Sequence, residues 1–335
     1  MNRKRWLLRR FAVSLLALWF VFSATFFLVA LTGDPNEAVV EYGVAQELAG
    51  SGASEAEIEE AIEEATQAYR DARNLDEPIT DRYVSWMSNL LRLDLGFAFS
   101  HPQPVTSLLV DRLAITLGYL VPGLAIALVG GTVLGTYTAL GNRPVLTHAL
   151  RVGSYGVFGL PNFWLAMMAI AIGFQEFGFL FLTGYELERG VLSTHNAKRL
   201  VLPALLVGTG LMAEQARFVR ASILERHREL FVALVRAKGG SETRVAIHVL
   251  RNEFVSLSAL FVSTLLGVLL VNVFVIEYVF NIPGFGLLSY NAILDRDLPV
   301  IVGMTLVVAI VGIGGNFLQD VVAASVDPRV VLTDE

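Results

Sequence analysis

Residues 228–252 read RELFVALVRAKGGSETRVAIHVLRN, and the sequence on either side of this stretch is apolar enough to cross a bilayer. The stretch itself, which we call the cassette, has no continuous apolar run and contains a Gly-Gly pair. Its positive side chains are Arg228, Arg236, Lys238, Arg244 and Arg251. Charges of this number are costly within the hydrocarbon region. We therefore expect the cassette to lie in water between two membrane spans.

The first half of the cassette has the spacing of an amphipathic helix. Its apolar stripe comprises Leu230, Phe231, Leu234 and Val235. The charged residues Glu229, Arg236 and Lys238 lie off this stripe. A loop that needed only positive charge would not require an apolar stripe. We therefore expect this helix to fit a groove on another protein.

The middle of the cassette carries the signals for a sharp break between two helices. Gly239 and Gly240 suit a left-handed helix end. Ser241 can cap a second helix that has Glu242 in its first turn. The cassette therefore predicts a short helix, a break, and a second helix that leads into the next span.

The composition of the whole chain is that of a membrane protein. Of its 335 residues, 54% are hydrophobic, and the mean hydropathy of +0.59 exceeds that of an ordinary soluble protein. A helix of about 20 apolar residues spans a bilayer. The six predicted spans cover residues 11–31, 113–139, 152–182, 200–216, 255–280 and 299–324. The third contains Pro161, which predicts a kink there.

The positions of the cations predict the orientation. They are concentrated in residues 1–10, in the loop after the second span, and in residues 217–254. All three segments fall on one side of a six-span chain, which the positive-inside rule assigns to the cytoplasm. The predicted organisation is a cytoplasmic N-terminus (1–10), a first transmembrane helix (11–31), an external acidic helical loop (32–112), a transmembrane domain (113–324) with a cytoplasmic loop at 217–254, and a cytoplasmic C-terminus (325–335). The first apolar run is longer than the roughly 7–15 residues of a signal peptide, so we expect it to be retained as an anchor.

The external loop carries much of the acid in a chain whose formal net charge is −6. Residues 54–74 have an apolar face at helical spacing, and Ser54 with Glu57 forms a capping-box pattern. Residues 81–96 predict a second, amphipathic helix. The acidic helix is either a solvated lid packed on its neighbours or a docking surface for an external partner.

Signatures of chemistry are missing from the sequence. No Walker-type phosphate loop occurs, the five histidines are scattered, and there are no cysteines. The pattern therefore predicts no nucleotide hydrolysis, no metal site, no cofactor and no nucleic-acid partner. The carboxylates Glu176, Glu214 and Asp320 lie near the ends of the predicted spans. Their positions argue against a proton-coupled carrier, which we expect to keep a deep carboxylate.

The cassette resembles the cytoplasmic loop, often called the EAA loop, of ABC importer permeases. The resemblance is strongest to the branch that imports dipeptides, oligopeptides and nickel, where R-E-D-Y-V-R-T-A-R-A-K-G-L-S-E is a typical stretch. The matching residues are Arg228, Glu229, Val232, Arg236, Ala237, Lys238, Gly239, Ser241 and Glu242. Phe231 replaces a tyrosine, and the departures are Leu230, Ala233 and Gly240.

Further stretches of this branch occur in the family's order along the chain. They are TGDP (Thr32–Pro35), DLG (Asp94–Gly96), LPNFWL (Leu160–Leu165), ARFVRASILE (Ala216–Glu225), EYVFNIPGFG (Glu277–Gly286) and DPR (Asp327–Arg329). Each is weak alone, but the ordered set is specific. The acidic helix at 54–74 matches no family stretch.

The resemblance implies an all-α membrane protein with the six-helix fold of a type I ABC importer permease, in the cell membrane. It implies a transport subunit rather than an enzyme, forming half of the pathway for dipeptides or oligopeptides. Its partners would be a second permease subunit, two cytoplasmic ATP-binding subunits and an extracytoplasmic substrate-binding protein. The residues expected to couple it to the ATPase are Arg228, Glu229, Phe231, Leu234, Val235, Arg236, Ala237, Lys238, Gly239 and Ser241.

Two alternatives remain open at this point. An importer of nickel or an oligosaccharide would share the ABC architecture. An ion- or proton-coupled secondary transporter would show repeated halves and broken spans with polar groups at the membrane midplane.

Overall fold

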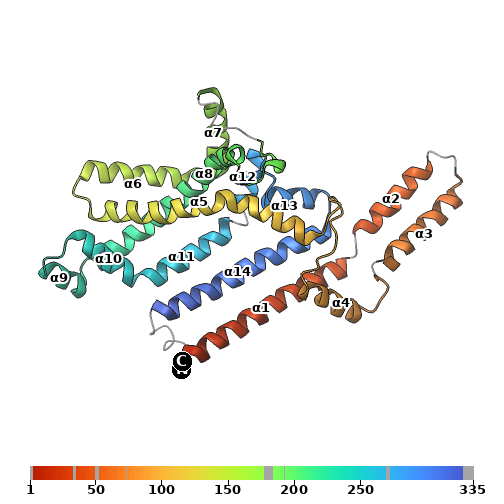
Figure 1. Ribbon diagram of the computed structural model, residues 1–335, viewed down its shortest axis with the longest axis horizontal. Helices are drawn as coiled ribbons and strands as arrows, with labels where there is room; N and C mark the ends of the chain where they lie inside the picture. Colours follow the sequence, from red (N-terminus) through yellow and green to blue (C-terminus); the bar gives the residue numbers. More distant parts are fainter. Residues whose placement is uncertain are drawn as a thin grey trace. The chain divides into compact units, whose positions relative to one another are not determined.

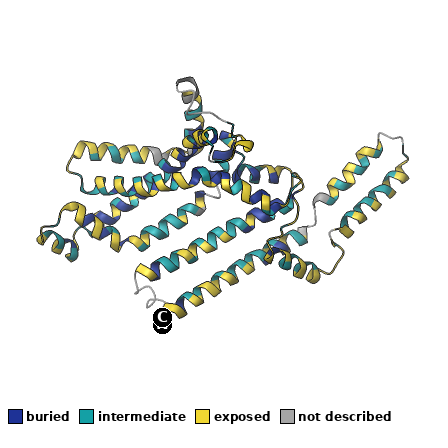
Figure 2. Ribbon diagram, in the orientation of Figure 1, coloured by how far each residue is buried: buried dark blue, intermediate teal, exposed yellow. Residues whose placement is uncertain are grey.

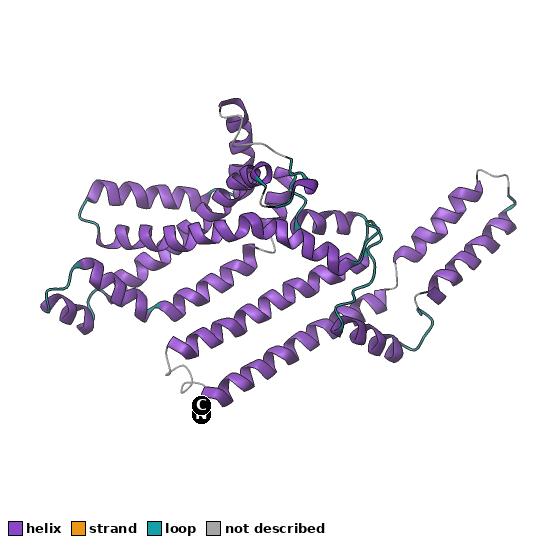
Figure 3. Cartoon of the chain, in the orientation of Figure 1, coloured by secondary structure: helices purple, strands orange, loops and turns teal. Residues whose placement is uncertain are grey.

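The computed structural model describes residues 3–32, 35–49, 53–72, 74–176, 184–191, 193–268 and 272–326. These residues form helices joined by loops (Figure 3). The β-type pairing among the described residues is an isolated bridge between Phe97 and Pro104. The chain divides into two compact units. The first comprises Met1–Ser14, Leu109–Asn291 and Val308–Glu335, and the second comprises Leu15–Leu108 and Ala292–Val307.

The first and last predicted spans are single long helices, α1 (Arg3–Thr32) and α14 (Leu298–Val326) (Figure 1). α1 begins at Arg3, so it includes most of the predicted N-terminal segment at 1–10, whose cytoplasmic location stays a prediction. Trp6 is buried in one cluster with Ala324. The predicted C-terminal segment at 325–335 lies outside the described residues apart from the last two residues of α14.

The external loop contains three helices: α2 (Pro35–Ala49), α3 (Glu55–Ala72) and α4 (Ile79–Leu91). The predicted capping box of α3 is confirmed, because the Ser54 backbone N–H and hydroxyl both donate to Glu57 at 2.8 Å. These two bonds hold the pKa of the Glu57 carboxyl below its ordinary value. No residue of α3 is buried (Figure 2). α2 was not predicted, and it is tied to α3 by an ion pair between Glu37 and Arg70 at 3.0 Å.

The second and fourth predicted spans lie within two long helices, α5 (Val105–Leu140) and α8 (Thr194–Arg226). The two helices approach closely because α5 carries small residues where α8 crosses it. A Cβ atom on Gly135 would lie only 2.7 Å from the Val219 Cβ, and one on Gly131 would lie 2.6 Å from the Gln215 Cβ. This close contact packs α5 and α8 tightly together within the first unit.

The third and fifth predicted spans each contain two of the described helices. The third consists of α6 (Pro144–Gly159) and α7 (Asn162–Glu176), which are separated at Pro161, where the kink was predicted. The fifth consists of α11 (Phe254–Gly267) and α12 (Val273–Phe280). Residues 177–182 and 269–271 of these two spans lie outside the described residues.

Two further helix pairs are sharply bent. α10 (Glu242–Asn252) meets α11 at 65°, and α12 meets α13 (Phe285–Leu294) at 86°. Three described helices are long and apolar enough to cross a membrane, or up to five spans if each bent pair counts as one. The number of six spans stays a prediction.

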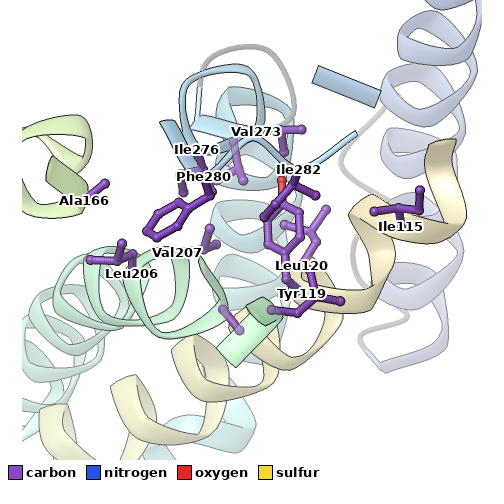
Figure 4. Packing of buried hydrophobic residues seen from close by; sticks show 13 residues of the cluster. Ile115, Tyr119, Leu120, Ala166, Leu206, Val207, Val273, Ile276, Phe280 and Ile282 are labelled. Carbon is purple, nitrogen blue, oxygen red and sulfur yellow. The ribbon is translucent and has the colours of Figure 1, made fainter. Parts of the chain in front are cut away.

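The core of the first unit joins the start of α5 to α12. Tyr119 and Leu120 of α5 pack with Ile276 and Phe280 of α12 and with Val207 of α8 (Figure 4). A second cluster joins the other end of α5 to the cassette. The clusters include Ile115 and Ala139 of α5, which lie about 36 Å apart along a helix axis at about 1.5 Å per residue. The two clusters therefore lie toward opposite ends of α5.

The bend between α12 and α13 is built around a fully buried carboxylate, Glu277. Its Oε1 accepts hydrogen bonds from the hydroxyls of Thr116 (2.5 Å) and Tyr119 (3.0 Å). Its Oε2 accepts from the backbone N–H groups of Gly286 (2.6 Å) and Leu287 (3.0 Å) at the start of α13. Glu277 is thus a buried carboxylate near the end of the fifth predicted span, in addition to the three carboxylates noted from the sequence.

Candidate functional site

The cassette folds as the predicted helix, break and second helix. Its first helix, α9 (Leu230–Ala237), runs from a cap position at Glu229 to one at Lys238. Gly239 has φ +78°, a left-handed conformation that a side chain would strain. Ser241 caps α10, and its hydroxyl accepts from the Arg244 backbone N–H at 3.4 Å. These local predictions are confirmed.

The cassette is anchored to the membrane helices by an apolar cluster. Val232 of α9 is fully buried and packs with Val245 and Val249 of α10. The same cluster contains Val219 and Ile223 of α8. The last residues of α5 are packed against it as well. This cluster therefore joins α9 and α10 to the ends of α5 and α8.

Ion pairs fix the two halves of the cassette relative to each other. Arg236 donates two hydrogen bonds to the Glu242 carboxylate, each 2.9 Å long, across the break. The Arg236 guanidinium thereby lowers the pKa of the Glu242 carboxyl. Arg226 pairs with Glu229 at 2.9 Å and also with Glu253. Glu229 and Arg236 thus form ion pairs with residues of this same chain.

The side of α9 that faces away from the cluster is apolar and exposed. We call it the outer face, and its members are Leu230, Ala233, Leu234 and Ala237. The side chain of Leu230 is 89% exposed and that of Leu234 is 55% exposed. The prediction of one continuous stripe is corrected, because Phe231 and Val235 are only partly exposed and pack against the anchoring cluster.

A groove of about 370 Å³ runs beside the outer face. It is lined by Phe231, Leu234, Val235, Lys238, Arg244, His248 and Asn252. Its rim therefore carries two permanent cations next to an apolar floor. Arg228 and Lys238 are exposed, and neither side chain forms an ion pair with a described residue. A partner seated here would meet an apolar ridge flanked by positive charge.

The sequence predicted the first helix of the cassette but not which of its side chains face outward. Leu230 was noted as a departure from the family stretch, yet it is the most exposed large apolar residue of α9. Val232 matched that stretch, yet its role as the buried anchor was not predicted. The spacing of Leu230, Ala233, Leu234 and Ala237, at i, i+3, i+4 and i+7, was the available signal. Among the described residues, no group of three or more metal-ligating side chains comes together.

Residues 131–332 match the family described as binding-protein-dependent transport system inner membrane component. This region contains α8, α9 and α10, and it spans more than half of the chain. The chain belongs to this family. It is thus a permease of the ABC importers, in the branch for dipeptides, oligopeptides and nickel, and a multi-pass protein of the cell membrane.

The relatives align with most or nearly all of the permease. It is 31% identical to a putative peptide permease protein of Brucella suis, over 98% of this chain and 99% of the relative. It is 28% identical to the oligopeptide transport system permease protein AppB of Bacillus subtilis, over 76% of this chain and 82% of the relative. It is 27% identical to the metal-staphylopine import system permease protein CntB of Staphylococcus aureus, over 81% of this chain and 82% of the relative.

Proposed function

We propose that this permease forms half of the membrane pathway of an ATP-driven importer of dipeptides or oligopeptides. A second permease subunit forms the other half, two cytoplasmic ATP-binding subunits supply the energy, and an external binding protein delivers the cargo. The assignment of peptides follows the name of the Brucella suis relative, which matches over 98% of this chain. Because one relative is named as a metal-staphylopine import permease, a metal chelate is the second candidate cargo.

The outer face of α9 is the observation that carries this proposal. Leu230 and Leu234 are 89% and 55% exposed on an eight-residue helix. An exposed apolar surface of this kind indicates a binding site for another protein. Short amphipathic helices commonly bind by laying an apolar face into a groove of another protein. We assign that groove to an ATP-binding subunit, and we expect acidic residues around it, opposite Lys238 and Arg244.

Coupling then follows from how α9 is attached. When the ATP-binding subunits close on ATP, they displace α9 together with α10, because Val232 and the Arg236–Glu242 pair hold the two as one body. The anchoring cluster passes the displacement to α5 and α8. Packed helices shift as rigid bodies between discrete arrangements, so a small motion at the cassette changes access at the pathway.

The proposed orientation places the cassette and both termini in the cytoplasm. It is supported by the cations of residues 217–254 and by the positive-inside rule. In this orientation we expect the bend between α12 and α13 on the external side, because it packs near the other end of α5 from the cassette. There it meets cargo released by the binding protein, and the acidic α3 lies in the same aqueous space.

Reconstitution of the complete importer in proteoliposomes tests this function. With all partner subunits and the binding protein present, labelled dipeptides or oligopeptides should accumulate with ATP and not with a non-hydrolysable analogue. ATP-dependent uptake of a metal chelate without any uptake of peptide would contradict the peptide assignment. A lack of ATP-dependent uptake of either cargo would contradict the importer.

A further inference from the structure

One flank of α4 is apolar and exposed, although this helix lies outside the predicted spans. Val84 is 65% exposed and Leu91 is 80% exposed. The two residues are seven positions apart, which places them on the same side of the helix, two turns from each other. Met87 lies between them on this side. We call Val84, Met87 and Leu91 the apolar flank, and an exposed apolar surface of this kind indicates an interaction.

α4 packs against the last turns of α1 through its aromatic residues. The hydroxyls of Tyr83 and Ser23 share a hydrogen bond of 2.7 Å. The ring centroid of Phe26 lies 5.4 Å from those of both Tyr83 and Trp86. α1 is one of the three described helices that are long and apolar enough to cross a membrane. Ser23 lies eight residues before position 31, the end of the predicted span, which is about 12 Å along the helix axis. α4 is thus held at the level where this span leaves the hydrocarbon core.

The opposite flank of α4 is polar. Arg82 and Asn89 line a cavity of about 700 Å³, whose wall also includes the ion pair between Glu37 and Arg70. Arg82 and Asn89 each lie two positions before a member of the apolar flank, which turns them about 160° away from it around the helix. α4 therefore has one side on α1, one side toward this polar cavity, and one apolar side that no described residue covers.

The apolar flank continues the exposed apolar surface of α1. Phe27 of α1 is 40% exposed, and its ring stacks on that of Tyr83 with centroids 5.4 Å apart. Leu31, one turn further on the same side of α1, is 78% exposed. In a multi-pass membrane protein, apolar side chains exposed at this level of a span face lipid acyl chains. Val84 directly follows Tyr83, so the same surface extends from α1 onto α4.

We propose that α4 lies in the membrane–water interface of the leaflet in which α1 ends, with its apolar flank among the acyl chains. An amphipathic helix in this position buries its apolar face about 5–10 Å into the boundary between headgroups and chains. Tyrosine and tryptophan are enriched at this depth, and α4 supplies Tyr83 and Trp86 there. The polar flank then faces water. The occupant of the apolar flank is thus the lipid bilayer, whichever cargo the importer carries.

Spin labels on single cysteines test this position. The chain has no cysteine of its own, so Val84→Cys and Leu91→Cys each introduce one site into the full-length permease. The labelled permease is assembled with cysteine-free partner subunits in nanodiscs of phosphatidylethanolamine and phosphatidylglycerol. Collisions with oxygen, which concentrates among the acyl chains, are compared with collisions with water-soluble chromium oxalate. The ratio of oxygen to chromium oxalate collisions should be severalfold higher at positions 84 and 91 than on the polar side.

The matched controls are Ser85→Cys and Asn89→Cys, because both residues are exposed and lie off the apolar flank of the same helix. Thr80→Cys adds a site one turn before Val84 on the apolar side. Thr80 is polar and exposed, so this variant keeps every apolar contact if the other two do not insert, and its ratio should also be high. Equal ratios on the two sides of α4 would overturn the inference. Few collisions with either reagent at positions 80, 84 and 91 would also overturn it, because another protein would then cover the flank.

Discussion

Replacing Leu230 and Leu234 together by serine should leave the permease in the membrane at its normal level and abolish uptake. Both side chains are exposed at 89% and 55%, so their removal costs the fold little. Burial of one leucine contributes about 1.5–3 kcal/mol, so loss of two weakens a docked complex by about 10²–10⁴-fold. ATP hydrolysis by the partner subunits should then no longer respond to cargo.

The matched control for this pair is Val145→Ser on α6. Val145 is 83% exposed, and the predicted topology puts it on the same side of the membrane as the cassette. It should keep wild-type uptake. Uptake at the wild-type rate by a correctly inserted Leu230→Ser, Leu234→Ser variant would refute the docking role of the outer face.

Glu277→Ala should have the largest effect on stability of any single substitution we consider. It removes the acceptor of four hydrogen bonds and leaves the buried N–H group of Gly286 and the partly buried N–H group of Leu287 unpaired. Each such donor costs about 1–3 kcal/mol, so the two together cost about 2–6 kcal/mol. Thermal unfolding of the detergent-solubilised permease should shift down by about 10 °C, at roughly 2–4 °C for each kcal/mol.

Glu277→Gln gives a graded comparison for the same site. The amide oxygen can still accept from the two backbone N–H groups, and its NH₂ can donate to the hydroxyls of Thr116 and Tyr119. The shift in unfolding temperature should therefore be clearly smaller than for alanine. Glu188→Ala, which removes an exposed carboxylate, should have no effect. An alanine variant at Glu277 as stable as wild type would show that the carboxylate does not hold the bend.

Features encoded by neighbouring residues could be predicted from the sequence. The capping box of Ser54 and Glu57, the left-handed Gly239 and the cap at Ser241 each depend on contacts within a few positions. The break at Pro161 also follows from the chemistry of one residue. The same reasoning located α9 and the residues of the candidate site, because helical spacing is visible in a single sequence.

Features that depend on distant contacts could not be predicted in this way. Leu230 and Phe231 are both apolar, and only packing against α8 and α10 decides that one faces outward and the other inward. Glu277 gains its role from Thr116 and Tyr119, which are 161 and 158 positions away. α2 does carry a start signal, Asp34 and Pro35 followed by Glu37, which was not used to predict a helix; its pairing with α3 through Glu37 and Arg70 is tertiary.

Site-directed cross-linking tests the central claim, that the outer face of α9 docks in an ATP-binding subunit, most directly. The chain contains no cysteine, so Leu230→Cys introduces a single thiol, and Val145→Cys supplies the control. A short bifunctional maleimide reagent is added to the assembled importer, whose ATP-binding subunits carry one cysteine in the expected groove. The account predicts a cross-link from position 230 and none from position 145. A transport-competent complex with no cross-link from position 230, or with equal cross-linking from both positions, would contradict it.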